Sequence, residues 1–176
     1  MSYTISKVAV TPETAVSLSA LAIWCFAAQF SGSNTKEDMD NYLRESLSVT
    51  AMTSEQGDPD NTFLWAMSDE SKRAIGYAKY RTGSSEACVK GPNPIELERL
   101  YVDPDNIGAG VGKALLDKVV QFTKDEGFST LWLGVWEENP RSIKFYVREG
   151  FLDVGTHDFV LGGDVQNDRI MERRIS

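Results

Sequence analysis

The sequence predicts a single α/β domain spanning residues 1–176. Strand-like and helix-like segments alternate in the order strand, two helices, three strands, helix, strand, helix and two strands, without a repeat or a linker between domains. A chain of 176 residues can bury one ordinary core, and 41% hydrophobic and 25% charged residues are typical of a globular protein. The third observation is a glycine-rich turn that opens directly into an amphipathic helix, and this turn indicates where a ligand binds.

The N-terminal third is expected to hold one strand and two helices. The strand covers residues 3–9, the first helix runs from 12 to about 29, and the second runs from a cap at 34–38 to about 48. Thr11 and Pro12 supply an N-cap and a proline at the first helical position, so the first helix has a defined start. This helix is apolar over a wide arc, which predicts that it is largely buried. Residues 56–61 are rich in turn formers and predict a loop.

The rest of the chain is expected to build most of the sheet. Strands are predicted at 63–67, 74–80, 95–102, 130–136, 151–161 and 166–175, and helices at 110–126 and 140–149. The first two of these strands form a hairpin, and a long loop at 82–94 follows them. The last two strands form a second hairpin, divided by Gly162-Gly163-Asp164. Gly127 is the expected C-terminal cap of the helix before it.

Composition excludes several classes of function. A net charge of −8 disfavours nucleic acid as a partner, because phosphates would be repelled. Cys25 and Cys88 have no metal-ligand spacing and a single histidine, His157, removes most transition-metal sites, so no metal is expected. No apolar run approaches the ~20 residues needed to span a bilayer, and the N-terminus lacks the pattern of a signal peptide. We therefore expect a cytoplasmic protein without a membrane partner.

The turn between the strand at 95–102 and the following helix predicts a phosphate-binding site. Gly108-x-Gly110-x-Gly112 leaves backbone N–H groups unpaired at the positive end of a helix dipole, where an anion binds. The spacing is one residue short of the dinucleotide fingerprint. It also fails as a Walker A loop, because Ile107 stands at the first glycine and Ala114 replaces the magnesium-binding hydroxyl. The phosphorylated ligand is therefore of another kind.

A second cluster lies on the helix after the strand at 130–136. Asn139, Ser142 and Tyr146 are spaced at i, i+3 and i+7, so they share one helix face. Taken alone, a tyrosine in the position of Tyr146 is more commonly an ordinary half-buried core aromatic.

Together the two clusters resemble the GNAT acetyltransferase superfamily, from about Ile95 to the end of the chain. The resemblance implies a mixed, mostly antiparallel sheet with helices on both faces and a splayed parallel pair formed by residues 95–102 and 130–136. It implies acetyl-coenzyme A as co-substrate, with its pyrophosphate on the backbone of the loop. Those loop residues are Ile107, Gly108, Ala109, Gly110, Val111, Gly112 and Lys113.

The same resemblance assigns roles to the neighbouring segments. Leu100, Tyr101 and Val102 would pair with the pantetheine arm, which Asn139 and Ser142 would also contact, and Tyr146 would act as general acid on the departing thiolate. Backbone N–H groups near residues 100–102 would stabilise the oxyanion. The sequence departs from the family at Ile107, where Arg or Gln is usual. Weaker phosphate contacts are expected there, with Lys113 restoring some positive charge.

Four further segments are similar to bacterial spermidine/spermine N-acetyltransferases of the PaiA type. They are residues 34–47, 96–102, 132–137 and 159–171. This similarity implies transfer of an acetyl group to a primary amine, with a polyamine as the expected small-molecule acceptor. Family members often dimerise through their late strands, so a homodimer is an expectation.

The acceptor amine has a pKa near ~10.4 and must lose a proton before it attacks. Glu98 is the candidate base, although an ion pair with Arg99 or another neighbour is an equal alternative. Trp136 and Glu137 could line the acceptor site, the indole against a methylene chain and the carboxylate toward a distal ammonium. The alternative is a core tryptophan and a solvated glutamate.

Two other functions remain open from the sequence. One keeps the chemistry but uses a protein amine or an aminoglycoside-like amine as acceptor. The other is a non-catalytic sensor of acyl-coenzyme A that retains the fold.

Overall fold

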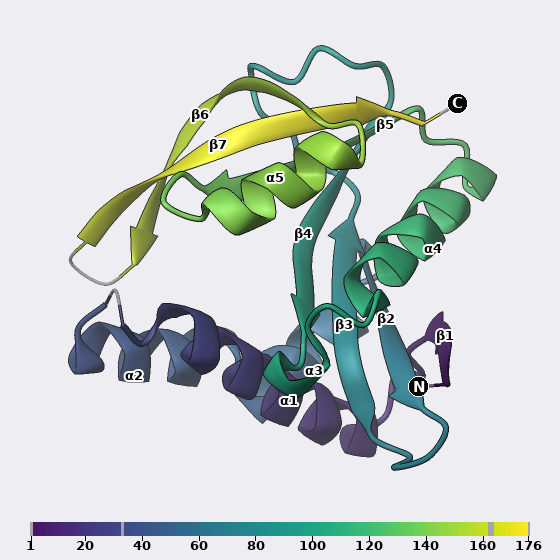
Figure 1. Cartoon of the computed structure of the whole chain (residues 1–176), viewed down its shortest axis with the longest axis vertical. Helices are drawn as coiled ribbons and strands as arrows, with labels where there is room; N and C mark the ends of the chain where they lie inside the picture. The colour runs from purple at the N-terminus through teal and green to yellow at the C-terminus, as the bar shows by residue number, and fades with distance from the viewer. Residues whose placement is uncertain (1, 33, 162–163, 176) are drawn as a thin grey trace. The chain divides into compact units, whose positions relative to one another are not determined.

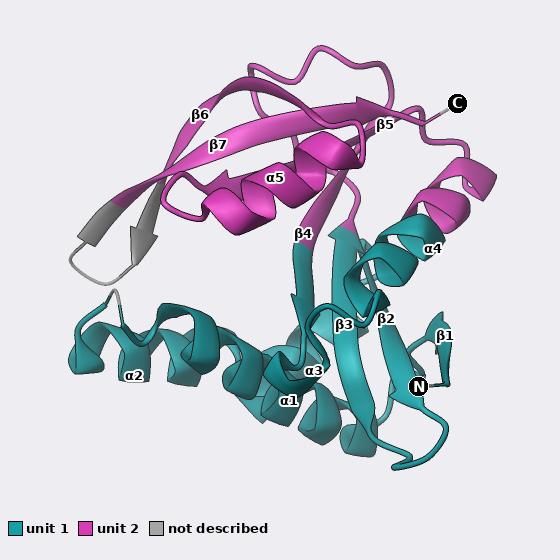
Figure 2. Cartoon of the chain, viewed as in Figure 1, with its two compact units in different colours: residues 1–80, 99–119 teal, residues 81–98, 120–176 magenta. Residues whose placement is uncertain are grey.

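The structure, a computed structural model, describes residues 2–32, 34–161 and 164–175 (Figure 1). The predicted turn at Gly162–Gly163 lies outside the described residues. Contacts divide the chain into two compact units, unit 1 (Met1–Tyr80 and Arg99–Val119) and unit 2 (Arg81–Glu98 and Val120–Ser176) (Figure 2). The strands pair in the order β1-β2-β3-β4-β5-β7-β6, and the boundary between the units passes through β4 and α4.

The elements follow the predicted order with one addition. The strands are β1 (Tyr3–Lys7), β2 (Asn61–Ser68), β3 (Ala74–Arg81), β4 (Pro94–Val102), β5 (Thr130–Trp136), β6 (Leu152–Leu161) and β7 (Asp164–Arg174). The helices are α1 (Pro12–Phe30), α2 (Lys36–Ser46), α3 (Val49–Gly57), the short 3-10 turn η1 (Pro104–Asn106), α4 (Val111–Asp125) and α5 (Pro140–Arg148). The predicted α/β fold class is confirmed.

The additional element is α3, which the sequence analysis missed. The second predicted helix was expected to continue to about residue 48, but α2 ends at Ser46 and Ser48 caps a new helix by accepting from the N–H of Ala51 at 3.3 Å. Part of the predicted loop at 56–61 therefore belongs to α3. The first strand is also shorter than predicted, since β1 ends at Lys7 and the prediction ran to residue 9.

Helix α1 is part of the core of unit 1. Thr11 accepts from the N–H of Thr14 and Pro12 occupies the first turn, as predicted. By length and composition α1 is the one helix of the described chain that could cross a membrane. Its buried residues recur at helical spacing and the helix packs on α3, which is how an amphipathic core helix behaves. The buried set is Ala15, Leu18, Ser19, Leu21, Ala22, Cys25 and Phe26.

The sheet of unit 1 has packing on both faces. Gly76 of β3 admits α4 closely, because a Cβ built there would lie 3.1 Å from both Val111 and Leu115 and 3.0 Å from the carbonyl oxygen of Tyr101. On the opposite face, Tyr77 is fully buried and stacks on the ring of Tyr101 at 5.7 Å. The start of α4 is thus seated directly on the sheet.

Unit 2 contains the parallel pairing of β4 with β5. The register of β4 with β5 runs from Pro94↔Thr130 to Glu96↔Trp132, only the first three residues of β4, so the predicted splayed pair is confirmed. Strand β5 then pairs antiparallel with β7 over its whole length, and β7 pairs with β6. The long loop before β4 is anchored to this sheet, because Glu172 of β7 accepts from the N–H groups of Lys90 and Gly91 at 3.0 and 3.3 Å.

Candidate active site

The predicted site residues fall into two groups, one in each unit. The end of β4 and the glycine loop (residues 100–113) belong to unit 1. Glu98, Trp136, Glu137, Asn139, Ser142 and Tyr146 belong to unit 2. In each group, hydrogen bonds and packing within the same unit position the side chains.

In unit 1 a tight turn leads from β4 into the glycine loop. Asp103 caps η1 by accepting from the N–H of Asp105 at 3.3 Å, and its other oxygen accepts from the side-chain amide of Asn106 at 3.0 Å. Trp24 of α1 donates its indole N–H to Asp103 at 3.0 Å. Asn106 is buried, and its carbonyl accepts from the N–H of Ala109, so the turn and the loop form one hydrogen-bonded structure.

The glycine loop requires backbone conformations that other residues rarely adopt. Gly108 and Gly110 have φ angles of 90° and 82°, in the left-handed region, and a Cβ at either would meet open space rather than protein. The first helical hydrogen bond of α4 runs from the N–H of Ala114 to the carbonyl of Gly110 at 3.0 Å. The N–H groups at the start of α4 therefore precede the first hydrogen bond of the helix.

This arrangement fits a phosphate group. The N–H groups at the start of α4 lie at the positive end of its dipole, and no side chain at positions 108 and 110 blocks approach to the backbone. Ile107 is 45% exposed and adds no charge. Lys113 is bound to Asp117 one turn later at 2.9 Å, so its charge is shared within the helix rather than given entirely to the loop. Binding of a phosphate through this backbone stays a prediction.

Replacing Gly110 with alanine is expected to weaken coenzyme A binding about tenfold or more, because the strained loop would mis-aim N–H groups that bind an anion. The same strain should cost about 1 kcal/mol of stability. Gly127→Ala is the matched control, since Gly127 has a φ of 89° and open space at its Cβ position but caps the far end of α4. Calorimetric titration with coenzyme A should show a loss for Gly110→Ala alone, and equal losses for both variants would contradict the assignment of the loop.

In unit 2, Tyr146 is held rigidly on α5. Its side chain is 9% exposed, and its ring meets Phe145 and Phe151 edge-on at 5.2 and 5.5 Å. Burial raises the pKa of the Tyr146 hydroxyl above its usual range. The hydroxyl therefore keeps its proton at neutral pH, as a proton donor must.

Asn139 and Ser142 have a structural explanation of their own. Asn139 is the N-cap of α5, and its side-chain oxygen accepts from the N–H of Ser142 at 3.1 Å. Capping orients the first turn of the helix that carries Tyr146. Their contact with a pantetheine arm stays a prediction.

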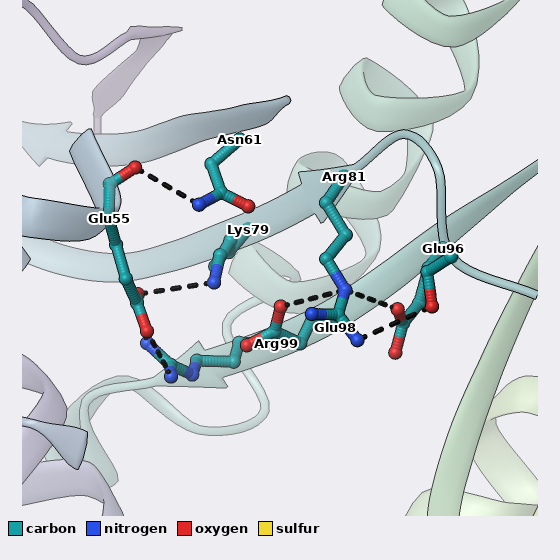
Figure 3. Close-up of polar contacts among 8 residues, drawn as sticks. Glu55, Asn61, Lys79, Arg81, Glu96, Glu98 and Arg99 are labelled. Carbon is teal, nitrogen blue, oxygen red and sulfur yellow. Dashed lines mark hydrogen bonds and ion pairs between the residues drawn. The ribbon is translucent and has the colours of Figure 1, made fainter. Parts of the chain in front are cut away.

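Glu98 forms an ion pair in unit 2. Its carboxylate lies 3.2 Å from Nε of Arg81, which also contacts Glu96 (Figure 3). One guanidinium thus contacts two carboxylates, and the ion pair is the alternative that the sequence left open for Glu98.

A second charged group, in unit 1, was not predicted. Glu55 of α3 accepts from both terminal nitrogens of Arg99 at 2.8 and 2.9 Å and lies 3.2 Å from Nζ of Lys79 (Figure 3). Lys79 is 3% exposed and lies over the ring of Phe63 at 5.8 Å. Arg99 therefore binds the carboxylate of Glu55. This contact was missed from the sequence because α3, the helix that carries Glu55, was not predicted.

Trp136 and Glu137 end β5 next to an acid that the sequence did not single out. Trp136 is half-buried and Glu137 is exposed. The register of β5 with β7 places Asp168 directly opposite Trp136. Burial raises the pKa of Asp168 to about 6, against a smaller lowering by His157. Asp168 lies in the segment 159–171 that resembles the PaiA type, but the sequence predicts no role for it, because only the pairing of distant strands brings it to Trp136.

Comparison with known proteins identifies the class. Residues 24–151 match the acetyltransferase (GNAT) family. The chain is 30% identical over 150 residues to an N-acetyltransferase of Lactobacillus delbrueckii subsp. lactis, covering 85% of this chain and 86% of that protein. The chain therefore belongs to the GNAT family and is an acetyl-coenzyme A-dependent N-acetyltransferase.

Two similar proteins come from Thermoplasma acidophilum. The chain is 27% identical over 144 residues to a spermidine N(1)-acetyltransferase, covering 78% of this chain and 81% of that protein. The structure also resembles that of the PaiA N-acetyltransferase in complex with coenzyme A, with a TM-score of 0.78, 26% identity and 99% of each chain covered. The resemblance to the PaiA type inferred from the sequence is confirmed.

No group of three or more His, Cys, Asp or Glu side chains in the described part of the chain could hold a metal ion.

Proposed function

We propose that this protein, acting as one domain over residues 1–176, transfers the acetyl group of acetyl-coenzyme A to a primary amine of a polyamine such as spermidine. The observation that carries the proposal is the similarity to a spermidine N(1)-acetyltransferase across 78% of this chain. The net charge of −8 supports it, since a polycation would be attracted by an acidic protein. The free thiols of Cys25 and Cys88 fit a reducing, cytoplasmic location. A homodimer stays an expectation from the family.

In the proposed reaction, bound acetyl-coenzyme A supplies a thioester as acetyl donor. The glycine loop, residues 107–113, would bind the pyrophosphate through backbone N–H groups, and residues 100–102 would align the pantetheine arm. These roles rest on the left-handed glycines and the free helix terminus of unit 1.

Proton movements would be assigned to two side chains of unit 2. The ammonium of the acceptor loses a proton to Glu98, through water, and the neutral nitrogen then forms its bond to the acetyl carbon as the carbon–sulfur bond breaks. The departing thiolate takes the proton of Tyr146, and the acetylated nitrogen gives its second proton back to the Tyr146 oxygen, which leaves an amide, the free thiol and one proton on Glu98. Glu98 stays the candidate base, with its carboxylate 3.2 Å from Nε of Arg81, which also contacts Glu96.

A panel of acceptors tests this function. Initial rates of thiol release should be measured with spermidine, spermine, a monoamine such as butylamine, an aminoglycoside and a lysine-containing peptide. We expect the highest kcat/KM for spermidine or spermine. Turnover of the peptide with inert polyamines would contradict the proposal, and no release with any amine would favour the sensor.

A further inference from the structure

The face of the unit 2 sheet around Asp168 has a composition suited to an organic cation. Residues directly opposite in an antiparallel pair share a face, so Trp136 on β5, Asp168 on β7 and His157 on β6 form one row across three strands. The row joins an aromatic ring, a carboxylate and an imidazole.

The carboxylate of Asp168 lies next to Gly134, the residue of β5 that has no side chain. A Cβ built at Gly134 would come within 3.2 Å of Asp168 Oδ2, and Gly134 is exposed although its strand is otherwise largely buried. Any side chain at Gly134 would therefore press on Asp168. The absence of a side chain at Gly134 leaves room for the Asp168 carboxylate beside β5.

The side chain of Asp168 makes no hydrogen bond or salt bridge with another residue of the described ranges, although burial raises its pKa. His157 of β6 lowers the pKa of Asp168 by a smaller amount, and its Nδ1 lies 3.1 Å from Glu86 in the loop before β4. The neighbouring strand β5 presents Trp132, Gly134 and Trp136 on this face and no charge. A half-buried carboxylate in such surroundings costs stability unless a cation joins it.

A second polar group on the same face also lacks a partner. Trp132 is 3% exposed, lies two residues before Gly134, and its indole N–H meets no acceptor among the described residues. Buried donors are normally satisfied, so this face is suited to an incoming ligand and its water.

We propose that Asp168, with the indole of Trp136 and the backbone of Gly134 beside it, binds the non-reacting ammonium of the polyamine acceptor and so determines specificity for polycations. The inference rests on the proposed function and adds the residue that recognises the second charge. The methylene chain would lie on the indole of Trp136, and the ammonium would donate to the Asp168 carboxylate.

The test is Asp168→Asn, which keeps the shape and removes the charge. The KM for spermidine should rise about 10- to 100-fold, the range expected for losing one charge-assisted hydrogen bond, while kcat and the KM for acetyl-coenzyme A stay within twofold. Asp158→Asn is the matched control, because Asp158 is an exposed acid on β6 that pairs with Asn167 rather than with this row. Its KM for spermidine should stay within twofold of the unsubstituted protein.

Thermal melting gives an independent readout. Because the folded-state pKa of Asp168 is raised to about 6 from 3.8, the ionised carboxylate costs stability above that pH. Asp168→Asn should therefore melt at a higher temperature than the unsubstituted protein at pH 8, and the difference should shrink as the pH falls from 6 toward 4. A variant that melts lower at pH 8 would show a structural role and overturn the inference.

The outcomes separate the two proposals. If the unsubstituted protein acetylates spermidine and Asp168→Asn has the same KM, the inference is wrong and the proposed function stands. If the unsubstituted protein leaves spermidine unacetylated, the proposed function is wrong and this inference with it.

Discussion

Tyr146→Phe is expected to lower kcat by about 10² to 10⁴, the range for loss of a general acid. The ring is held by Phe145 and Phe151, so phenylalanine should occupy the same space and leave α5 in place. In this prediction the hydroxyl is the proton donor, and its pKa, which burial raises, leaves it protonated at neutral pH. Only the departure of the thiolate should slow, so the affinity for coenzyme A is expected to stay within twofold.

Stopped-time thiol release measures kcat, and calorimetric titration with coenzyme A measures the retained binding. Tyr77→Phe provides the matched control, since Tyr77 is a fully buried tyrosine whose hydroxyl has no partner among the described residues. Removing that hydroxyl should leave kcat unchanged and raise stability slightly. Full activity in Tyr146→Phe would remove Tyr146 from the mechanism.

Glu55→Gln is expected to destabilise the protein by about 3 kcal/mol or more. The carboxylate of Glu55 is shared by Lys79 and Arg99, whose side chains are only 3% and 10% exposed. A neutral amide would leave two buried cations side by side without the negative charge between them. The loss should therefore exceed the worth of an ordinary ion pair.

Urea unfolding followed by fluorescence gives the free energy of unfolding. The control is Glu45→Gln, because Glu45 lies 3.9 Å from Arg44 with 73% of its side chain exposed, and its loss should cost no more than about 0.5 kcal/mol. Equal small losses in both variants would mean that the buried group contributes no more than the surface pair.

Local chemistry explains which elements the sequence could predict. Gly108 and Gly110 adopt left-handed conformations, and such glycines ahead of an amphipathic helix predict the loop and α4 together. Helix α3 has no comparable signal, because residues 49–57 are rich in Val, Thr, Ser and Gly and its buried residues are only Met52 and Gln56. Its packing on α1, which depends on tertiary structure, decides its conformation.

The candidate site also contains residues that local sequence could predict and residues that only tertiary structure brings together. Tyr146 could be predicted because its spacing from Asn139 lies within one helix. Asp168 could not, because it reaches Trp136 only through the antiparallel register of β5 and β7. Glu55 could not either, since its partners are on β3 and β4 while it lies on the helix that was missed.

The most direct test of the account is mass spectrometry of the acceptor after incubation of the protein with acetyl-coenzyme A and spermidine. The account predicts one acetyl group added to a primary amine of spermidine for each molecule of coenzyme A released. Release of coenzyme A without acetylated spermidine, or no release at all, would contradict it.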